Sequence, residues 1–199
     1  MRKLIIWNLM TLDGYFEGKS PWDLTYHQLA WGEELRAYSL EICRQADLLV
    51  FGRKTYEGMA AHWVDATEEL EIKEYMNSIA KIVASRTLAH ADWNNTRVVR
   101  DIVGELTALK AQPGQNIFVF GSAEMADSLL KAGLIDEMRI CLVPVVLGGG
   151  NPHFKPAETP MVFTLLEARS LKTGGVVLRY APAPSASGPQ PMRLAKRTE

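Results

Sequence analysis

The chain has 199 residues, a hydrophobic content of 47% and a formal net charge of −1, the composition of an ordinary globular domain with a full core. The balanced charge argues against a nucleic-acid partner, and no apolar run approaches the roughly 18 residues that a membrane span requires. Cys43 and Cys141 lie far apart without histidines at ligand spacing, so we expect no disulfide framework, no metal site and a cytoplasmic location.

Apolar runs alternate with helical patterns along most of the chain. The first strand is expected at residues 3–10, followed by a long loop at residues 11–24 and a helix from Thr25 to Ala46 that Thr25 caps. The further expected elements, in chain order, are a strand at 47–51, helices at 53–61 and 67–77, strands at 81–84 and 97–99, a helix at 101–111, a strand at 116–120, a helix at 123–132 and strands near 137–143, 162–170 and 176–180.

Strands that alternate with helices and then end in a hairpin predict an α/β sandwich. Its central sheet is expected to be mostly parallel, with an antiparallel C-terminal hairpin joined by residues 172–175. The domain is expected to cover residues 1–181. Residues 182–199, rich in proline, serine and basic residues, are expected to form a disordered tail.

Three short segments place backbone amides or fixed positive charge where a phosphate-bearing cofactor needs them. They are Gly52-Arg53-Lys54-Thr55-Tyr56-Glu57, Ser85-Arg86-Thr87 and Phe120-Gly121-Ser122-Ala123-Glu124, each following an apolar run that reads as a buried strand. The first and third also open predicted helices, whose N-terminal amides attract anions. The recurrence suggests a nucleotide with more than one phosphate group, although the first strand lacks the Gly-x-Gly-x-x-Gly turn of a Rossmann unit.

These segments resemble motifs of the dihydrofolate reductase superfamily, and more closely of its branch related to the C-terminal reductase domain of the bifunctional riboflavin-biosynthesis enzyme. Thr11-Leu12-Asp13-Gly14, Ile135-Asp136-Glu137 and the run from Val143 to Gly150 are similar to that branch as well, so the resemblance covers about residues 2 to 180. It implies a dihydrofolate-reductase-like three-layer sandwich, NADPH as cofactor, a small-molecule substrate and a homodimer. Ser85 and Arg86 stand where the family holds the adenosine 2′-phosphate, which favours NADPH over NADH.

Both substrate motifs known in these relatives are altered. Pro21-Trp22-Asp23-Leu24 resembles a folate-reductase segment that is followed by a carboxylate, but this chain continues with Thr25-Tyr26-His27-Gln28-Leu29. Phe120-Gly121-Ser122 stands where the riboflavin-type reductase has Glu-Gly-Gly, so a polar anchor for its substrate is missing. The resemblance therefore implies a reductase of a small heterocyclic compound, pterin-like or pyrimidine-like, whose identity stays open.

The candidate site residues follow from the same motifs. We expect the cofactor to be bound by Met10, Gly14, Gly52, Arg53, Lys54, Thr55, Ser85, Arg86, Thr87, Phe120, Gly121, Ser122, Ala123, Glu124 and Met125. Trp22, Gly148 and Gly149 are the candidate substrate contacts, and Asp13, Glu17 and His27 are the candidate catalytic residues. His62, His90 and His153 have no partner at useful spacing and are interpreted as surface or packing residues.

Alternatives remain at this point. Arg53 and Arg86 are also compatible with ordinary surface roles, although their placement at strand ends and helix starts favours phosphate contact, while Thr55 is compatible with a helix-terminal role and Asp13 with a simple Asp-Gly turn. A non-catalytic nucleotide-binding or structural dimer of the same fold is one alternative function. Reduction of the ribosylaminopyrimidine of riboflavin biosynthesis is a second.

Overall fold

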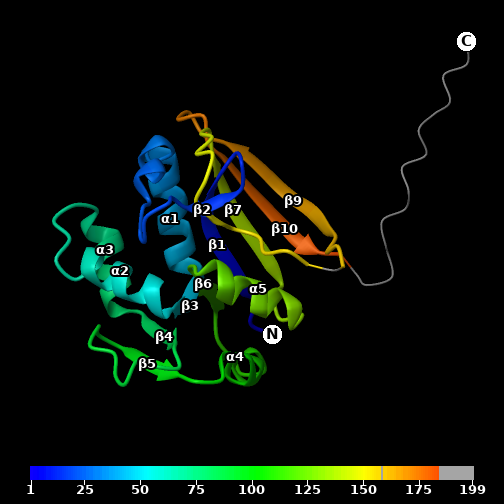
Figure 1. Ribbon diagram of the computed structural model, residues 1–199. Coiled ribbons are helices and arrows are strands. Elements are labelled where there is room, and N and C mark those ends of the chain that lie inside the picture. Colours follow the sequence, from blue (N-terminus) through cyan, green and yellow to red (C-terminus); the bar gives the residue numbers. More distant parts are fainter. Residues whose placement is uncertain (158, 184–199) are drawn as a thin grey trace, which may run out of the picture.

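An eight-stranded sheet forms the centre of the computed structural model, which describes residues 1–157 and 159–183 (Figure 1). The strand order is β5-β4-β3-β6-β1-β7-β10-β9. The parallel strands are β1 (Leu4–Thr11), β3 (Ala46–Gly52), β4 (Ala80–Ala84), β5 (Thr96–Val99), β6 (Asn116–Val119) and β7 (Glu137–Val143). The antiparallel strands are β9 (Phe163–Ser170) and β10 (Val176–Pro182), while β2 (Tyr15–Glu17) and β8 (Asn151–Pro152) form a separate small sheet.

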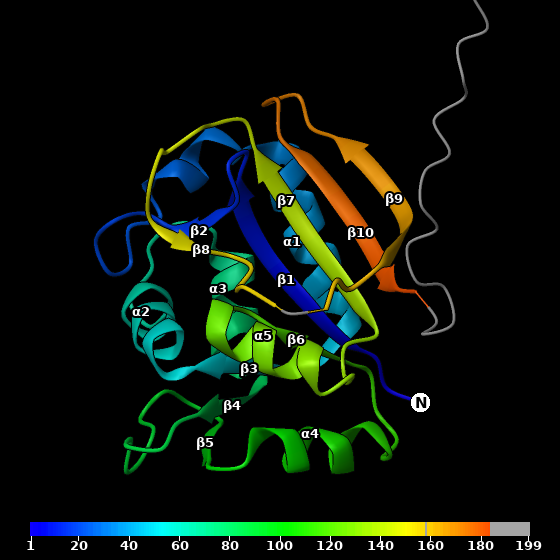
Figure 2. The same ribbon diagram turned by 45° about the vertical axis from the view of Figure 1, so that its right-hand side comes forward.

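Helices cover both faces of the large sheet (Figures 1 and 2). One face packs against α1 (Glu33–Gln45), α2 (Arg53–Trp63) and α3 (Leu70–Ser78), and the other against α4 (Ile102–Lys110) and α5 (Ala123–Lys131). A short 3-10 helix, η1 (Thr25–Leu29), precedes α1. The layers are therefore helix, sheet and helix, which confirms the predicted α/β sandwich with its antiparallel terminal hairpin.

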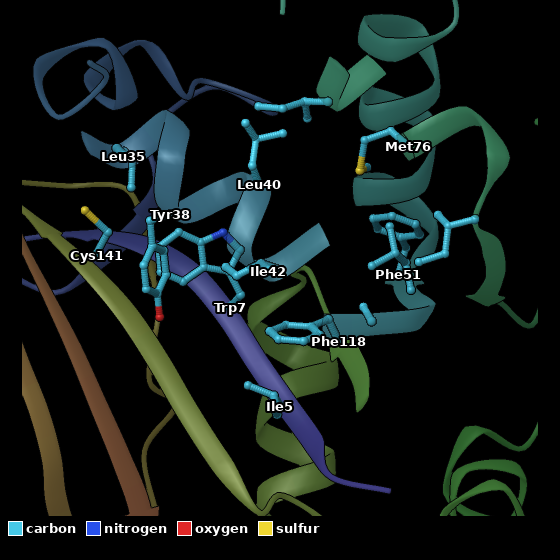
Figure 3. Packing of buried hydrophobic residues seen from close by; sticks show 14 of the residues in the cluster. Ile5, Trp7, Leu35, Tyr38, Leu40, Ile42, Phe51, Met76, Phe118 and Cys141 are labelled. Carbon is cyan, nitrogen blue, oxygen red and sulfur yellow. The ribbon is translucent and has the colours of Figure 1, made fainter. Parts of the chain in front are cut away.

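Strand β1 shows why these residues form a central strand. Leu4 and Ile6 are buried in the core on the α4 and α5 side, whereas Ile5 and Trp7 are buried in the core on the α1 side. Side chains alternate between the two faces of a strand, so a strand covered on both faces is apolar at every position. On the α1 side the Trp7 and Tyr38 rings lie 5.2 Å apart between β1 and the helix (Figure 3).

Two expectations for the N-terminal third are wrong. Residues 11–24 contain the short strand β2, and the predicted helix over residues 25–46 is divided into η1 and α1. Gly32, not Thr25, is the residue before the α-helix, and the Thr25 hydroxyl instead donates to Asp23 at 2.8 Å. Helical spacing continues through both pieces, so periodicity alone did not reveal the break at residues 30–32.

The C-terminal boundary also differs from the expectation. Strand β10 runs to Pro182, and the Ala183 amide still donates to the Val162 carbonyl at 2.8 Å, so the proposed tail at 182–199 begins too early. The rest of that segment, from residue 184, lies outside the described residues. Proline is tolerated at the end of this strand because the end of a strand does not require its missing N–H.

One part of the sheet lacks a helix on the α4 and α5 side. Figure 2 shows the near face of β10 and β9 without such cover, and Leu165 and Leu166 of β9 are 52% and 51% exposed. The homodimer expected from the resemblance stays a prediction. Among the helices in the described part of the chain, none is both long and apolar enough to cross a membrane.

Candidate functional site

The candidate site lies where the chain changes from one face of the sheet to the other. The connections that leave β1 and β3 pass over the face covered by α1 and α2, whereas the connection that leaves β6, between them, passes over the opposite face to α5. Parallel sheets bind ligands in the crevice outside the carboxyl ends of their strands at such a switch point. The topology therefore selects the end of β6.

The N-termini of α2 and α5 converge at this point. A side chain at Gly52 would begin only 2.9 Å from the Ser122 hydroxyl oxygen. One at Gly121, whose φ is +52°, would begin 2.7 Å from the Thr55 hydroxyl oxygen. Gly52 provides no side-chain cap for α2, so the first amides of this helix remain for another acceptor. Two helix N-termini that face one crevice form an environment for a pyrophosphate.

Charged side chains around the two turns are partly committed to neighbours. Arg53 forms an exposed ion pair with Glu57 at 2.9 Å, whereas Lys54 is exposed and makes no ion pair among the described residues. Glu124, in the first turn of α5, lies 3.5 Å from Lys155. The backbone amides are therefore a more constant source of positive potential here than the arginine.

Hydrogen bonds from its own residues and from Arg100 hold the turn after β4 in place. The Ser85 hydroxyl oxygen accepts the backbone N–H groups of Thr87 at 3.2 Å and Leu88 at 2.9 Å. Arg100 donates to the carbonyl oxygens of Ser85 and of Leu88. Arg86 is exposed and has no ion-pair partner within the residues that the structure describes, so its guanidinium is available to an anion.

Asn8 connects β1 to the turn after β6. Its side chain is 4% exposed, and its Oδ1 accepts the Gly121 backbone N–H at 2.8 Å. Its Nδ2 lies 3.1 Å from Nε2 of His153, which is 2% exposed. Because Oδ1 is occupied by a backbone donor, Nδ2 is the donor toward His153, and Nε2 must accept. This chain of hydrogen bonds holds the glycine turn against the central strand.

The network fixes the protonation state of His153. An accepting Nε2 places the ring proton on Nδ1, which has no hydrogen-bond partner among the described residues. Burial, with a smaller contribution from the charge of Lys155, lowers the pKa of His153 to about 4. Burial likewise lowers the pKa of His27 to about 4. Both imidazoles are therefore neutral at pH 7.

Acidification is expected to destabilise the protein through His153. Because the unfolded chain binds the proton more readily, stability is full above the ordinary histidine pKa and falls as the pH drops toward 4. Between about pH 7.5 and about pH 5, the contribution of His153 to the free energy of unfolding falls by about 2 kcal/mol. Urea unfolding at both pH values should show a smaller loss for His153→Gln than for the wild type. The exposed His90→Gln is the matched control, and equal losses in all three proteins would contradict the assignment.

A cavity of about 650 Å³ opens beside Asn8 and Gly121, between the sheet, α1 and the α2–α3 segment. Six large aromatic side chains line its wall, namely Trp7, Phe16, Trp22, Trp31, Trp63 and Phe120. The polar end consists of Asn8, Thr55 and Gly121, next to the converging helix N-termini. The volume and the apolar wall are those of a site for a small organic ligand.

Comparison with known proteins identifies the family of this chain. The family model described as "RibD C-terminal domain" matches residues 2–177. The chain belongs to the RibD C-terminal domain family. It is also 28% identical over 186 residues to YyaP of Bacillus subtilis (strain 168), covering 90% of this chain and 94% of that protein. YwjB of the same organism is 26% identical over 153 residues, covering 77% and 83%.

Solved structures share the fold of this RibD C-terminal domain. A putative riboflavin biosynthesis protein from Shewanella sp. PV-4 superposes with a TM-score of 0.76 at 22% identity, covering 92% of this chain and 99% of that one. A pyrimidine reductase-like protein from Corynebacterium diphtheriae gives 0.62 at 14% identity, with 92% of both chains covered. Acinetobacter baumannii RibD gives 0.60 at 16%, covering 92% of this chain and 59% of RibD. The fold is thus dihydrofolate-reductase-like, as the sequence motifs implied.

The carboxylates expected to be catalytic in this RibD C-terminal domain are engaged in holding loops. Asp13 accepts the Thr11 hydroxyl at 2.6 Å and the amides of Leu147 at 3.2 Å and Gly148 at 2.8 Å. The Thr11 hydrogen bond is the main reason that the pKa of Asp13 lies below its usual value. Glu17 accepts the Trp22 amide and the Asn151 side-chain amide. Neither carboxylate lines the cavity.

Of the other candidates, His27 and Trp22 do line the cavity. The Trp22 ring lies so close to Gly58 that a side chain there would begin 2.4 Å from it. The backbone of Trp22 has a φ of +63°, so this loop position is strained for a tryptophan. Gly148 and Gly149 do not line the cavity, and they lie beside Asp13 and Lys19.

The remaining cofactor candidates flank the crevice in different ways. Ala123 and Met125 are buried in the α5 layer, so only their backbone groups can face a ligand. Met10 packs against the same core, and the Gly14 carbonyl accepts the His153 amide at 2.8 Å. These placements are compatible with a role beside a cofactor and leave the individual contacts as predictions.

Sequence reasoning missed Asn8, His153 and Arg100. His153 was interpreted as a surface or packing residue, but it is part of the buried polar network at the glycine turn. The signal for Asn8 was present, because one amide interrupts the apolar run from Leu4 to Met10. A buried polar side chain in a central strand needs a partner, which marks it as a candidate.

Proposed function

We propose that the protein is an NADPH-dependent reductase of a small heterocyclic compound. The convergence of the α2 and α5 N-termini beside an aromatic cavity, at the switch point of the sheet, is the observation that carries the proposal. Membership of the RibD C-terminal domain family and the likeness to a pyrimidine reductase-like fold support it. Bound NADPH would supply a hydride for the reduction of an unsaturated carbon.

The residues of this chain fit the parts of such a cofactor. The amides at the start of α2 and α5 suit the pyrophosphate, because glycines at positions 52 and 121 let backbone approach backbone closely. Arg86 and the Ser85 hydroxyl suit a 2′-phosphate, since a guanidinium without an ion-pair partner among the described residues and a hydroxyl donor are what a phosphate requires. The aromatic wall next to Asn8 suits a flat ring system.

Neither His27 nor Asp13, two of the predicted catalytic residues, is a ready proton donor for a reduction. His27 lines the cavity as a neutral imidazole, and the pKa of Asp13 lies below its usual value while its oxygens accept three hydrogen bonds. A group that holds no acidic proton near neutral pH is a poor general acid. We therefore expect the substrate to take its proton from water.

Titration with NADPH and NADH tests the cofactor half of the proposal. We expect the wild type to prefer NADPH, and Arg86→Ala to lose roughly tenfold to a hundredfold in NADPH affinity, since hydrogen bonds to charged groups contribute about 1.5–3 kcal/mol. The NADH affinity should change little, because NADH lacks the 2′-phosphate. Arg44→Ala, an exposed arginine of α1, is the matched control. Equal binding of both nucleotides, unchanged by Arg86→Ala, would contradict NADPH use.

A turnover assay tests the part of the proposal that makes the protein an enzyme. NADPH consumption with a panel of pterins, pyrimidines and quinones should rise above the rate without protein for at least one compound class. NADPH binding without consumption across the panel would favour the alternative of a non-catalytic nucleotide-binding protein.

A further inference from the structure

The cavity has an aromatic wall and an acidic mouth. Its charged lining residues are Asp65, Glu68 and Glu69, from the segment between α2 and α3. No lysine or arginine lines it in the described ranges 1–157 and 159–183. The absence matters because a ligand phosphate or carboxylate taken from water normally needs an arginine, a lysine or a set of aligned amides.

Only one of these three acids is neutralised nearby. Glu69 accepts the Arg36 side chain at 2.6 Å and the Trp31 indole N–H at 3.2 Å, so it fixes an aromatic ring of the wall. Asp65 and Glu68 are exposed and form no ion pair with any residue that the structure describes. Arg36 itself also lies 3.6 Å from Glu71, so its charge is shared between two carboxylates. The mouth therefore carries excess negative charge.

The helix N-termini do not compensate for this charge at the mouth. They lie next to Thr55 and Gly121, at the start of α2, whereas the acidic segment follows the end of that helix, and under the proposed function they hold the cofactor phosphates. A second anionic group, carried on the substrate, would face the acidic segment with no lysine or arginine among the described lining residues. Aromatic faces, by contrast, attract flat rings and planar cations.

We propose that the cavity takes a planar aromatic substrate without an anionic tail, either uncharged or cationic. The inference rests on the proposed function for calling the ligand a substrate. It separates this chain from reductases whose pyrimidine carries a phosphate. The ribosylaminopyrimidine phosphate of the second alternative function is therefore a poor ligand for this site.

Pairs of compounds that share a ring system and differ in one anionic group test the proposal. We suggest riboflavin against FMN, uridine against UMP, and pterin against pterin-6-carboxylate, with binding measured by calorimetry on the full chain, with and without NADPH. The uncharged member of at least one pair should bind about tenfold or more tightly than its anionic partner at low salt. The gap should narrow at about 0.5 M salt, because exposed charges are screened. The planar cation proflavine should bind at least as tightly as the uncharged compounds.

Charge reversal at the mouth tests whether Asp65 and Glu68 cause the discrimination against anionic compounds. The double variant Asp65→Lys and Glu68→Lys should remove most of the discrimination between the paired compounds. Asp92→Lys, an exposed acid outside the cavity lining, is the matched control and should leave the discrimination intact. Thermal unfolding of each variant shows whether the fold is retained, and the salt dependence of the wild type provides a test that needs no variant.

The outcomes separate this inference from the proposed function. Anionic members that bind as well as or better than their uncharged partners would overturn it, as would the failure of every uncharged compound and of proflavine to bind. If NADPH binds in either case, the proposed function stands without it. If the uncharged compounds bind and NADPH does not, the chemistry of the cavity stands and the proposed function fails.

Discussion

Replacement of Asn8 by leucine is expected to lower the free energy of unfolding by about 2–6 kcal/mol. The substitution removes the acceptor of the Gly121 amide and the donor to His153, and both remaining partners are buried. Each buried polar group left without a partner costs about 1–3 kcal/mol. Leucine branches at Cγ as asparagine does but is bulkier, so overpacking in the buried strand adds to this loss. Urea unfolding at neutral pH measures the change.

Two further variants make this test specific. Gln112→Leu changes an exposed amide to the same residue, and its stability should stay within about 0.5 kcal/mol of the wild type. Asn8→Asp retains an acceptor for Gly121 but cannot donate to His153, so it should favour the protonated form of that histidine. Its stability should then fall less steeply on acidification than that of the wild type. An Asn8→Leu protein as stable as Gln112→Leu would show that the hydrogen-bond chain does not hold the turn.

Replacement of Glu137 by leucine is expected to cost about 3–5 kcal/mol, because it leaves a buried positive charge without its partner. Glu137 is 1% exposed and accepts the side chains of Arg139 and Arg179, each at 2.7 Å. Arg139 is itself 4% exposed. Burial alone raises the pKa of Glu137, but the two arginines outweigh that effect and leave it below its usual value. The carboxylate is therefore ionised in the folded protein.

Two further variants separate the effect of the unpaired buried charge from the effect of changed packing. Adding Arg139→Met to Glu137→Leu removes the orphaned buried charge and should recover part of the stability, because Arg179 keeps its ion pair with Glu167 at 2.8 Å. Glu105→Leu, on α4, breaks a more exposed ion pair with Arg97 of β5 and should cost no more than about 1 kcal/mol. Urea unfolding of the four proteins gives the comparison. A Glu137→Leu loss as small as that of Glu105→Leu would contradict the buried-charge account.

These contacts explain what the Ile135-Asp136-Glu137 segment does in the fold. The sequence marked it only as similar to the riboflavin-type branch. In the structure, Asp136 accepts the Leu4 amide at 2.8 Å and pairs with Lys110 at 2.6 Å, next to the start of β1. Glu137 then neutralises charges within the sheet, so the segment stabilises the fold on which the site is built.

Part of the site could be predicted from the sequence, and part could not. The strand-to-helix turns at Gly52 and Gly121 were predictable, since an apolar run followed by glycine and a helical pattern identifies a helix N-terminus locally. The contact between Asn8 and His153 was not, because the two residues are 145 positions apart in the sequence and no local pattern relates them. Asp13 was predicted at the correct strand end, but two of its three hydrogen-bond partners lie on the loop after β7.

The sequence alone determined the alternation of strands and helices, the family resemblance and the phosphate-type turns, because each depends on residues within about a dozen positions of one another. Only the tertiary structure decided that the two helix N-termini meet. It also decided that His27 and His153 are buried as neutral rings, and that acids but no lysine or arginine line the cavity in the part of the chain that the structure describes. Burial and charge balance depend on which distant segments pack together, and local spacing does not specify that packing.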